Sequence, residues 1–200
     1  MSMIPFLLDE QAHQLGFQRW LGIDYNISSH VITSGRTGSG KTVCAKLLLA
    51  RTVLLAPPEL QPVEITVIDP KADDDFQFLV GMDNFYRGEQ APQGLSGFHE
   101  TFRRRQSGEN TSRNLKICFI DEHISLVSLI EDKREREMAQ RRLLLLAMLS
   151  RSFKCSIQLA TQQPKPSPIL HNPKAIRFQG EYRNRLWRFC IMLSICSQRG

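Results

Sequence analysis

The chain has 200 residues, enough for one domain with a substantial core, and its 42% hydrophobic and 23% charged residues are typical of globular proteins. It has no run of about 18 apolar residues that would cross a membrane, and its start lacks the basic region of a signal peptide. The five cysteines form no C-x-x-C pair, which favours reduced thiols in a cytoplasmic protein and does not indicate a metal site. The net charge of +6 fits a polyanionic partner without establishing one.

Short apolar runs alternate with helical stretches along the chain. The pattern predicts strands at residues 30–35, 63–69, 115–121 and 155–162, with a candidate fifth strand at 175–179. It predicts helices at residues 41–56, 99–106 and 133–152, with a candidate short helix at 73–82 and a loop at 87–97 (RGEQAPQGLSG). This alternation indicates an α/β fold in which helices cover both faces of a mostly parallel sheet.

A phosphate-binding loop follows the first predicted strand. The pattern G-x-x-x-x-G-K-[ST] is matched without exception by Gly35, Arg36, Thr37, Gly38, Ser39, Gly40, Lys41 and Thr42. Glycines let backbone N–H groups approach phosphates, and the following helix presents its positive end to them. We expect Lys41 to bridge the β- and γ-phosphates of ATP and the Thr42 hydroxyl to ligate Mg²⁺.

Two acidic residues end the third predicted strand, where ligands gather in open parallel sheets. We expect Asp121 to hold Mg²⁺ and Glu122 to act as the general base toward the attacking water. The fourth strand ends in LATQQP, and its polar tip could sense the γ-phosphate, with Gln162 as the candidate and Thr161 in reserve.

Four motifs in order resemble the motor domain of the FtsK/SpoIIIE DNA translocases, within the FtsK–HerA group of P-loop ATPases. The loop region, the strand TVIDPK, the strand ICFIDE and the stretch SFKCSIQLATQQP are similar to that family's phosphate loop, I-D-P-K hallmark, Walker B strand and L-A-T-Q-R-P stretch. The short segment LGID at residues 21–24 is similar to the family's lead-in. The resemblance covers about residues 20–180.

The resemblance implies a three-layer αβα RecA-like P-loop NTPase core that assembles as a hexameric ring. Such a homo-oligomer uses ATP and Mg²⁺ to move double-stranded DNA through its channel. Gly35, Gly38, Gly40, Lys41 and Thr42 would then bind ATP, while Asp121 and Glu122 form the Walker B pair and Gln162 is the sensor residue. Asp69 and Lys71 match the I-D-P-K hallmark, to which we assign a structural or coupling role. The simple organisation favours a short relative from a mobile element.

The sequence departs from the family's pattern at several positions. Gln163 replaces an arginine, His123 follows the acid pair where an apolar residue is commoner, and residues 71–114 match weakly. The last twenty residues lack the family's closing strand, helix and glycine-rich stretch, so this tail is either a helix or the product of a truncation or frameshift.

The predicted organisation has three parts: a lead-in segment at residues 1–29, the ATPase domain at 30–180, and an atypical basic tail at 181–200.

Arginine clusters leave several roles open. A ring ATPase needs an arginine from a neighbouring subunit at the transferred phosphate, and Arg151 is our candidate. The cluster Arg103, Arg104 and Arg105 is either a phosphate contact or a solvated loop, whereas residues 133–142 indicate a solvated helix face.

Two other functions compete with a DNA motor. One is a nucleotide- or DNA-binding remnant without turnover, which the unusual tail motivates. The other is a P-loop kinase for a small molecule, which the Asp-Glu strand end and the LATQ tip disfavour.

Overall fold

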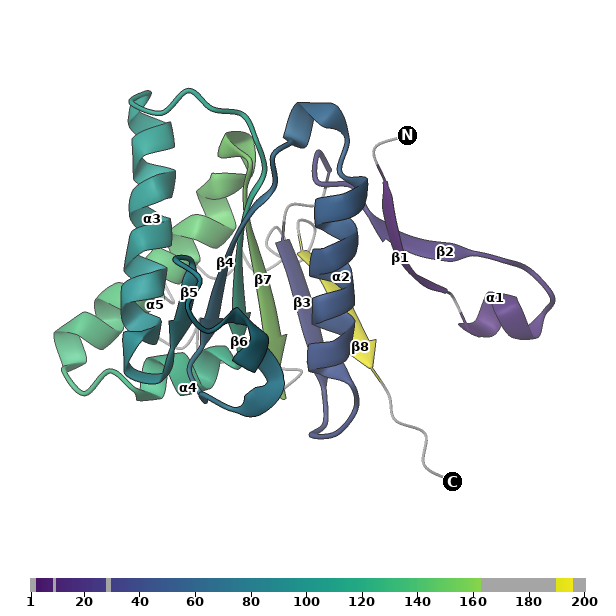
Figure 1. Cartoon of the computed structure of the whole chain (residues 1–200), viewed down its shortest axis with the longest axis horizontal. Coiled ribbons are helices and arrows are strands. Elements are labelled where there is room, and N and C mark those ends of the chain that lie inside the picture. The colour runs from purple at the N-terminus through teal and green to yellow at the C-terminus, as the bar shows by residue number, and fades with distance from the viewer. Residues whose placement is uncertain (1–2, 9, 28–29, 163–189, 196–200) are drawn as a thin grey trace, which may run out of the picture.

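A parallel sheet of six strands, in the order β5-β4-β6-β7-β3-β8, forms the centre of the chain in the computed structural model (Figure 1). The structure describes residues 3–8, 10–27, 30–162 and 190–195. The strands of this sheet are β3 (His30–Gly35), β4 (Glu64–Asp69), β5 (Phe85–Arg87), β6 (Lys116–Asp121), β7 (Cys155–Thr161) and β8 (Cys190–Ile195). Among the described residues, no helix has the length and apolar character that a membrane crossing requires.

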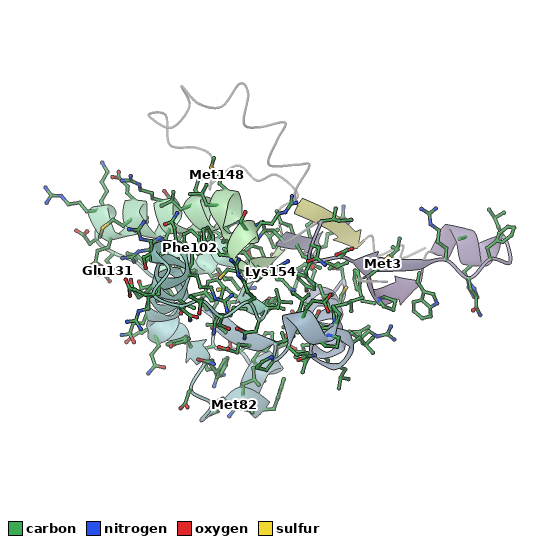
Figure 2. All side chains as sticks on the ribbon, turned by 90° about the horizontal axis from the view of Figure 1, so that it is seen from above. Met3, Met82, Phe102, Glu131, Met148 and Lys154 are labelled. Atoms are coloured by element: carbon green, nitrogen blue, oxygen red, sulfur yellow. The ribbon has the colours of Figure 1, made fainter. Side chains whose placement is uncertain are left out.

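Helices cover both faces of this sheet, which gives the three-layer αβα architecture expected from the sequence (Figure 1). One face packs against α2 (Lys41–Leu55), and the other packs against α3 (Ala91–Ser107), α4 (His123–Ser128) and α5 (Lys133–Leu149). Alternate residues of β6 serve the two cores: Phe119 packs on the α2 side and Ile120 on the other. Figure 2 shows Phe102 of α3 inside the molecule and Met82 at its periphery.

The N-terminal segment adds a separate two-stranded antiparallel sheet that projects beyond α2 (Figure 1). The strands of this sheet are β1 (Ile4–Leu8) and β2 (Trp20–Ile23), and the short helix α1 (Glu10–Gln14) lies between them in the chain. Ile4, Phe6, Ile23 and Tyr25 are buried in the core on the α2 side. Part of the predicted lead-in therefore packs as an integral part of the fold, while the boundaries of the three predicted parts stay predictions.

The structure confirms the four main predicted strands, the helix after the phosphate loop and the helix in the 133–152 region. The loop predicted at residues 87–97 is wrong. Helix α3 begins at Ala91, with Pro92 in its first turn, where proline is tolerated. Gly94 packs against the ring of Tyr86, and a Cβ on Gly94 would lie only 2.7 Å from that ring. The glycine that suggested a loop thus allows close packing between α3 and β5.

Several elements were not expected. The edge strand β5 and the helix α4 are too short to show a clear hydrophobic period. The candidate short helix at 73–82, by contrast, was expected, and this region forms the 3₁₀ helix η2 (Asp74–Leu79). Three further 3₁₀ turns connect the main elements: η1 (Pro58–Leu60), η3 (Gly88–Gln90) and η4 (Ser150–Phe153).

Within the tail, Cys190–Ile195 forms β8, which pairs in parallel with β3, so the helix interpretation is wrong for these six residues. The candidate strand at 175–179 and Gln163 lie outside the described residues.

Arg105 is a buried structural residue at the end of α3, so neither of the two interpretations of its cluster holds for it. Its side chain is only 5% exposed. Its guanidinium donates to the carbonyls of Asn114 and Phe153 at 2.9 and 2.8 Å, and to Asn114 Oδ1 at 2.7 Å. Arg105 therefore joins α3 to the segments that enter β6 and β7. The neighbouring Arg104 is exposed and pairs with Glu100 of the same helix.

Replacing Arg105 with alanine should lower the free energy of unfolding by about 3 kcal/mol or more, because several buried acceptors lose their donor. The matched variant Arg104→Ala should change it by less than about 0.5 kcal/mol, since its ion pair is exposed. Urea denaturation of both variants measures these changes. Equal effects in the two variants would contradict the structural role of Arg105.

Candidate functional site

The carboxyl ends of β3, β4, β6 and β7 meet at one edge of the sheet because these strands are parallel. In the observed register, Asp121 of β6 lies opposite Ala160 of β7, and Ala160 lies opposite Thr33 of β3. The phosphate loop, the acid pair and the tip of β7 therefore leave the sheet at the same level. Sequence motifs that are far apart along the chain form one candidate site.

The phosphate loop connects β3 to α2 as the motif requires. Gly35 ends β3, residues 36–40 form the loop, and Lys41 and Thr42 begin α2. Gly38 and Gly40 have φ angles of 74° and 83°, a backbone conformation that favours glycine, and no atom lies within 4 Å of a Cβ built on either. Backbone conformation, rather than lack of space, thus requires these two glycines.

The loop also has the electrostatics of an anion site. The carbonyl of Arg36 accepts hydrogen bonds from Ser39 N–H at 3.2 Å and from Lys41 Nζ at 2.9 Å, so Lys41 folds back over the loop. No acidic residue lies in the first turn of α2, and its N-cap residue, Gly40, makes no side-chain capping hydrogen bond. The positive amino end of this 15-residue helix is therefore suited to binding a phosphate.

Glu122 is held in a strained backbone conformation directly after β6. Its φ angle of 64° is unusual for a residue other than glycine, and its N–H donates to the Ala160 carbonyl at 3.0 Å. Both Asp121 and Glu122 are buried, with exposed fractions of 5% and 6%. Strained residues of this kind are concentrated at functional sites.

The Glu122 carboxylate contacts the tip of β7 and the end of the β4 motif. Its Oε2 accepts the backbone N–H of Gln162 at 3.2 Å and lies 3.9 Å from Lys71 Nζ. Its Oε1 lies 3.5 Å from the Thr161 hydroxyl, at the outer limit of a hydrogen bond. Gln162 thus reaches Glu122 through its backbone, whereas its own side chain is exposed and Thr161, the reserve candidate, is buried.

Three carboxylates, those of Asp69, Asp73 and Asp121, provide oxygen atoms that all lie within 4.8 Å of one another. Oxygen ligands of this kind are those that Mg²⁺ prefers. Burial raises the pKa of Asp121 to about 6 against the opposing effect of the Lys71 ammonium, and the nearby carboxylates of Asp73, Asp69 and Glu122 raise it further. This donor set fits a divalent cation, which would relieve the repulsion.

Sequence reasoning assigned Asp121 to the metal but missed Asp73, which follows the I-D-P-K hallmark by only two residues. The signal was available as the acidic run DDD at residues 73–75. A solvated turn explains such a run equally well until the fold brings its first residue beside Asp121.

His123 is buried directly after the acid pair, and Arg151 lies far from the phosphate loop of the same chain. Both ring nitrogens of His123 are buried with no hydrogen-bond partner among the described residues, and burial lowers its pKa. Arg151 lies in η4 before the amino end of β7, at the edge of the sheet opposite the phosphate loop. Burial lowers the pKa of His30 to about 4, and the positive charge of Arg151 adds to this effect. A role of Arg151 at a phosphate would therefore require the site of a second copy.

Comparisons with known proteins identify the fold. The sequence matches no protein-family model and no curated protein. Among solved structures, the cytoplasmic domain of EssC has a TM-score of 0.60 and 16% identity, covering 98% of this chain and 36% of that chain. The cytoplasmic domain of EccC, a type VII secretion ATPase from Thermomonospora curvata, has a TM-score of 0.60 and 18% identity, covering 84% and 22%.

A third similar structure is TcpA, the pCW3 conjugation coupling protein, with a TM-score of 0.54 and 21% identity over 77% of this chain and 48% of that chain. The chain thus spans less than half the length of each of these three structures. The likeness establishes the fold, which is a RecA-like fold with three layers, αβα.

Asp121→Asn should stabilise the metal-free protein increasingly as the pH rises from about 4 to about 7. The pKa of Asp121 is about 6 in the folded chain and lower in the unfolded chain, so ionisation above pH 4 destabilises the wild type relative to asparagine. The difference should approach about 3 kcal/mol at neutral pH, as measured by urea denaturation in EDTA.

Asp83→Asn, at an exposed position, controls for the loss of one carboxylate. Added Mg²⁺ at neutral pH should stabilise the wild type but not Asp121→Asn. A stability difference that is the same at pH 4 and pH 7 would contradict the burial argument.

Proposed function

We propose that the chain is an ATP-hydrolysing motor domain. The observation that supports this most is the meeting of the phosphate loop, Asp121 and a strained Glu122 at one edge of the sheet. A phosphate loop alone only binds a nucleotide, whereas hydrolysis also needs a metal-holding acid and a base beside it. In this proposal the loop after β3 binds the phosphates, and the end of β6 supplies both the metal-holding acid and the base.

Each residue has a role in this proposal. The loop N–H groups of residues 36–40 cradle the phosphates of ATP, and Lys41 moves from the Arg36 carbonyl to the β- and γ-phosphates. Thr42 and Asp121 hold Mg²⁺, which when bound offsets the charge on the phosphates. Glu122 accepts the proton of the attacking water, and Gln162 reports the state of the nucleotide through the tip of β7.

The substrate that the motor moves is proposed to be double-stranded DNA, handled by a cytoplasmic homo-oligomer in the form of a hexameric ring. The four ordered motifs of the FtsK type support this, as does the net charge of +6. One similar structure is a conjugation coupling protein, a role consistent with an origin in a mobile element. Arg151, at the edge of the sheet opposite the phosphate loop, is the proposed contact to a neighbouring subunit.

A polypeptide is the second candidate for the transported chain. The EccC structure, with a TM-score of 0.60 against this chain, is that of a type VII secretion ATPase. The same nucleotide site would serve either motor. Stimulation of ATP hydrolysis by a cargo distinguishes the two.

ATP hydrolysis should be stimulated by double-stranded DNA and reduced at least about 100-fold by Glu122→Gln, because the general base is lost. Lys41→Ala should abolish turnover by weakening nucleotide binding. Lys46→Ala, which removes a half-buried cation paired with Asp75 from the same helix, is the matched control and should retain turnover. Phosphate release is measured with and without DNA, and the oligomeric state is measured by light scattering in ATP.

The other functions predict different results. ATP binding by a monomer without hydrolysis would favour a remnant, and phosphate transfer to a small acceptor would favour a kinase. Hydrolysis at one rate with and without DNA removes the main support for a DNA motor, and stimulation by a polypeptide alone would favour the secretion type.

A further inference from the structure

Arg87, at the end of β5, holds the turn that follows β4. It lies opposite Asp69 in the register of the two strands, and its Nε is 3.7 Å from Asp69 Oδ2. Its Nη2 donates to the carbonyls of Ala72 and Asp73 at 2.5 and 2.7 Å. Its Nη1 donates to Gln77 Oε1 in η2 at 2.8 Å. One guanidinium thus spans a strand end, a turn and the following 3₁₀ helix.

The turn is fixed from its other side by the Asp69 carboxylate. Asp69 Oδ1 accepts the N–H of Ala72 at 3.1 Å. Ala72 is held at a φ angle of 55°, which is unfavourable for a residue with a Cβ. A backbone conformation of this kind persists only where the surroundings impose it, and here Arg87 and Asp69 do so.

This turn determines where Lys71 lies. The Lys71 Nζ is 3.9 Å from Glu122 Oε2, and its positive charge opposes the raised pKa of Asp121. The same Glu122 oxygen accepts the N–H of Gln162. Lys71 and the tip of β7 therefore hold the Glu122 carboxylate between them, and Lys71 is the only cation paired with it among the described residues.

We propose that Arg87 is a positioning residue for catalysis, acting through the 71–73 turn to place Lys71 against the Glu122 carboxylate. The inference deepens the proposed function and rests on it, since Glu122 is the proposed general base. Arg87 touches neither phosphate nor water in this arrangement. Its loss lets the turn relax, moves the Lys71 ammonium and leaves Glu122 held by β7 alone.

Arg87→Ala should therefore lower kcat for ATP about 10-fold while KM for ATP changes less than about twofold, because the phosphate loop is intact. Lys71→Met, which keeps the side-chain length without the charge, should give a similar split. Arg87→Lys should recover only part of the loss, since one ammonium cannot replace the planar fork. Arg104→Ala, which removes an exposed arginine with one carboxylate partner, is the matched control.

The double variant decides whether Arg87 acts through Lys71. In Lys71→Met/Arg87→Ala, kcat should stay within about twofold of Lys71→Met alone. The charge that Arg87 positions is already missing in Lys71→Met, so the loss of Arg87 has little further effect. A kcat loss equal to the product of the two single losses would overturn the proposal. So would a fall in kcat that follows only the melting temperature of each variant.

Hydrogen exchange tests the arrangement without turnover. Arg87→Ala should speed exchange about fivefold at the amides of Ala72 and Gln162, whereas Lys71→Met should do so only at Gln162. Unchanged exchange at Gln162 in Lys71→Met would overturn the proposal even in an active protein. If the wild type does not hydrolyse ATP but the two variants show these changes in exchange, the proposed function is overturned. The Arg87–Lys71–Glu122 arrangement then still holds.

Discussion

The hydrogen bond from the Glu122 N–H to the Ala160 carbonyl is the constraint on which the candidate site depends. It lies one residue beyond the last β6 pairing, Asp121 with Ala160, so β7 still holds the chain where it turns into α4. The left-handed backbone of Glu122 costs about 1 kcal/mol, and a hydrogen bond of about 1 kcal/mol offsets it. The turn directs the Glu122 carboxylate toward Gln162 and keeps Asp121 in line with the sheet.

Excess negative charge is the second feature that organises this edge of the sheet. Asp69, Asp73, Asp121 and Glu122 converge there, and Lys71 and Arg87 partly balance them. Burial is the largest cause of the raised pKa of Asp121, and repulsion from the nearby carboxylates adds to it, so this edge favours protonation or a bound cation. The two cations differ in their duties. Arg87 donates to backbone carbonyls, whereas the Lys71 ammonium lies near the Glu122 carboxylate.

The sequence predicted well what is contiguous in the chain. The phosphate loop and the strand that leads to Asp121 and Glu122 can be recognised from neighbouring residues alone. The strand and helix beside the loop show clear hydrophobic patterns. It failed where a residue type has two physical meanings. The stretch 87–97 suggested a loop, but its Gly94 allows α3 to pack on Tyr86. Arg105 suggested either a phosphate contact or a solvated loop, but it donates to buried carbonyls. Strand β5 has only three residues, too few for a period to show.

The sequence by itself determined the fold class, the phosphate loop and the identity of the acid pair, because local hydrophobic period and glycine spacing encode them directly. Only the tertiary structure decided which distant side chains share the site. Asp73 joins Asp69 and Asp121, Thr161 lies beside Glu122, and Arg87 reaches the turn before it in the chain. These contacts depend on strand order and register, which bring residues together across the sheet irrespective of their separation in the sequence.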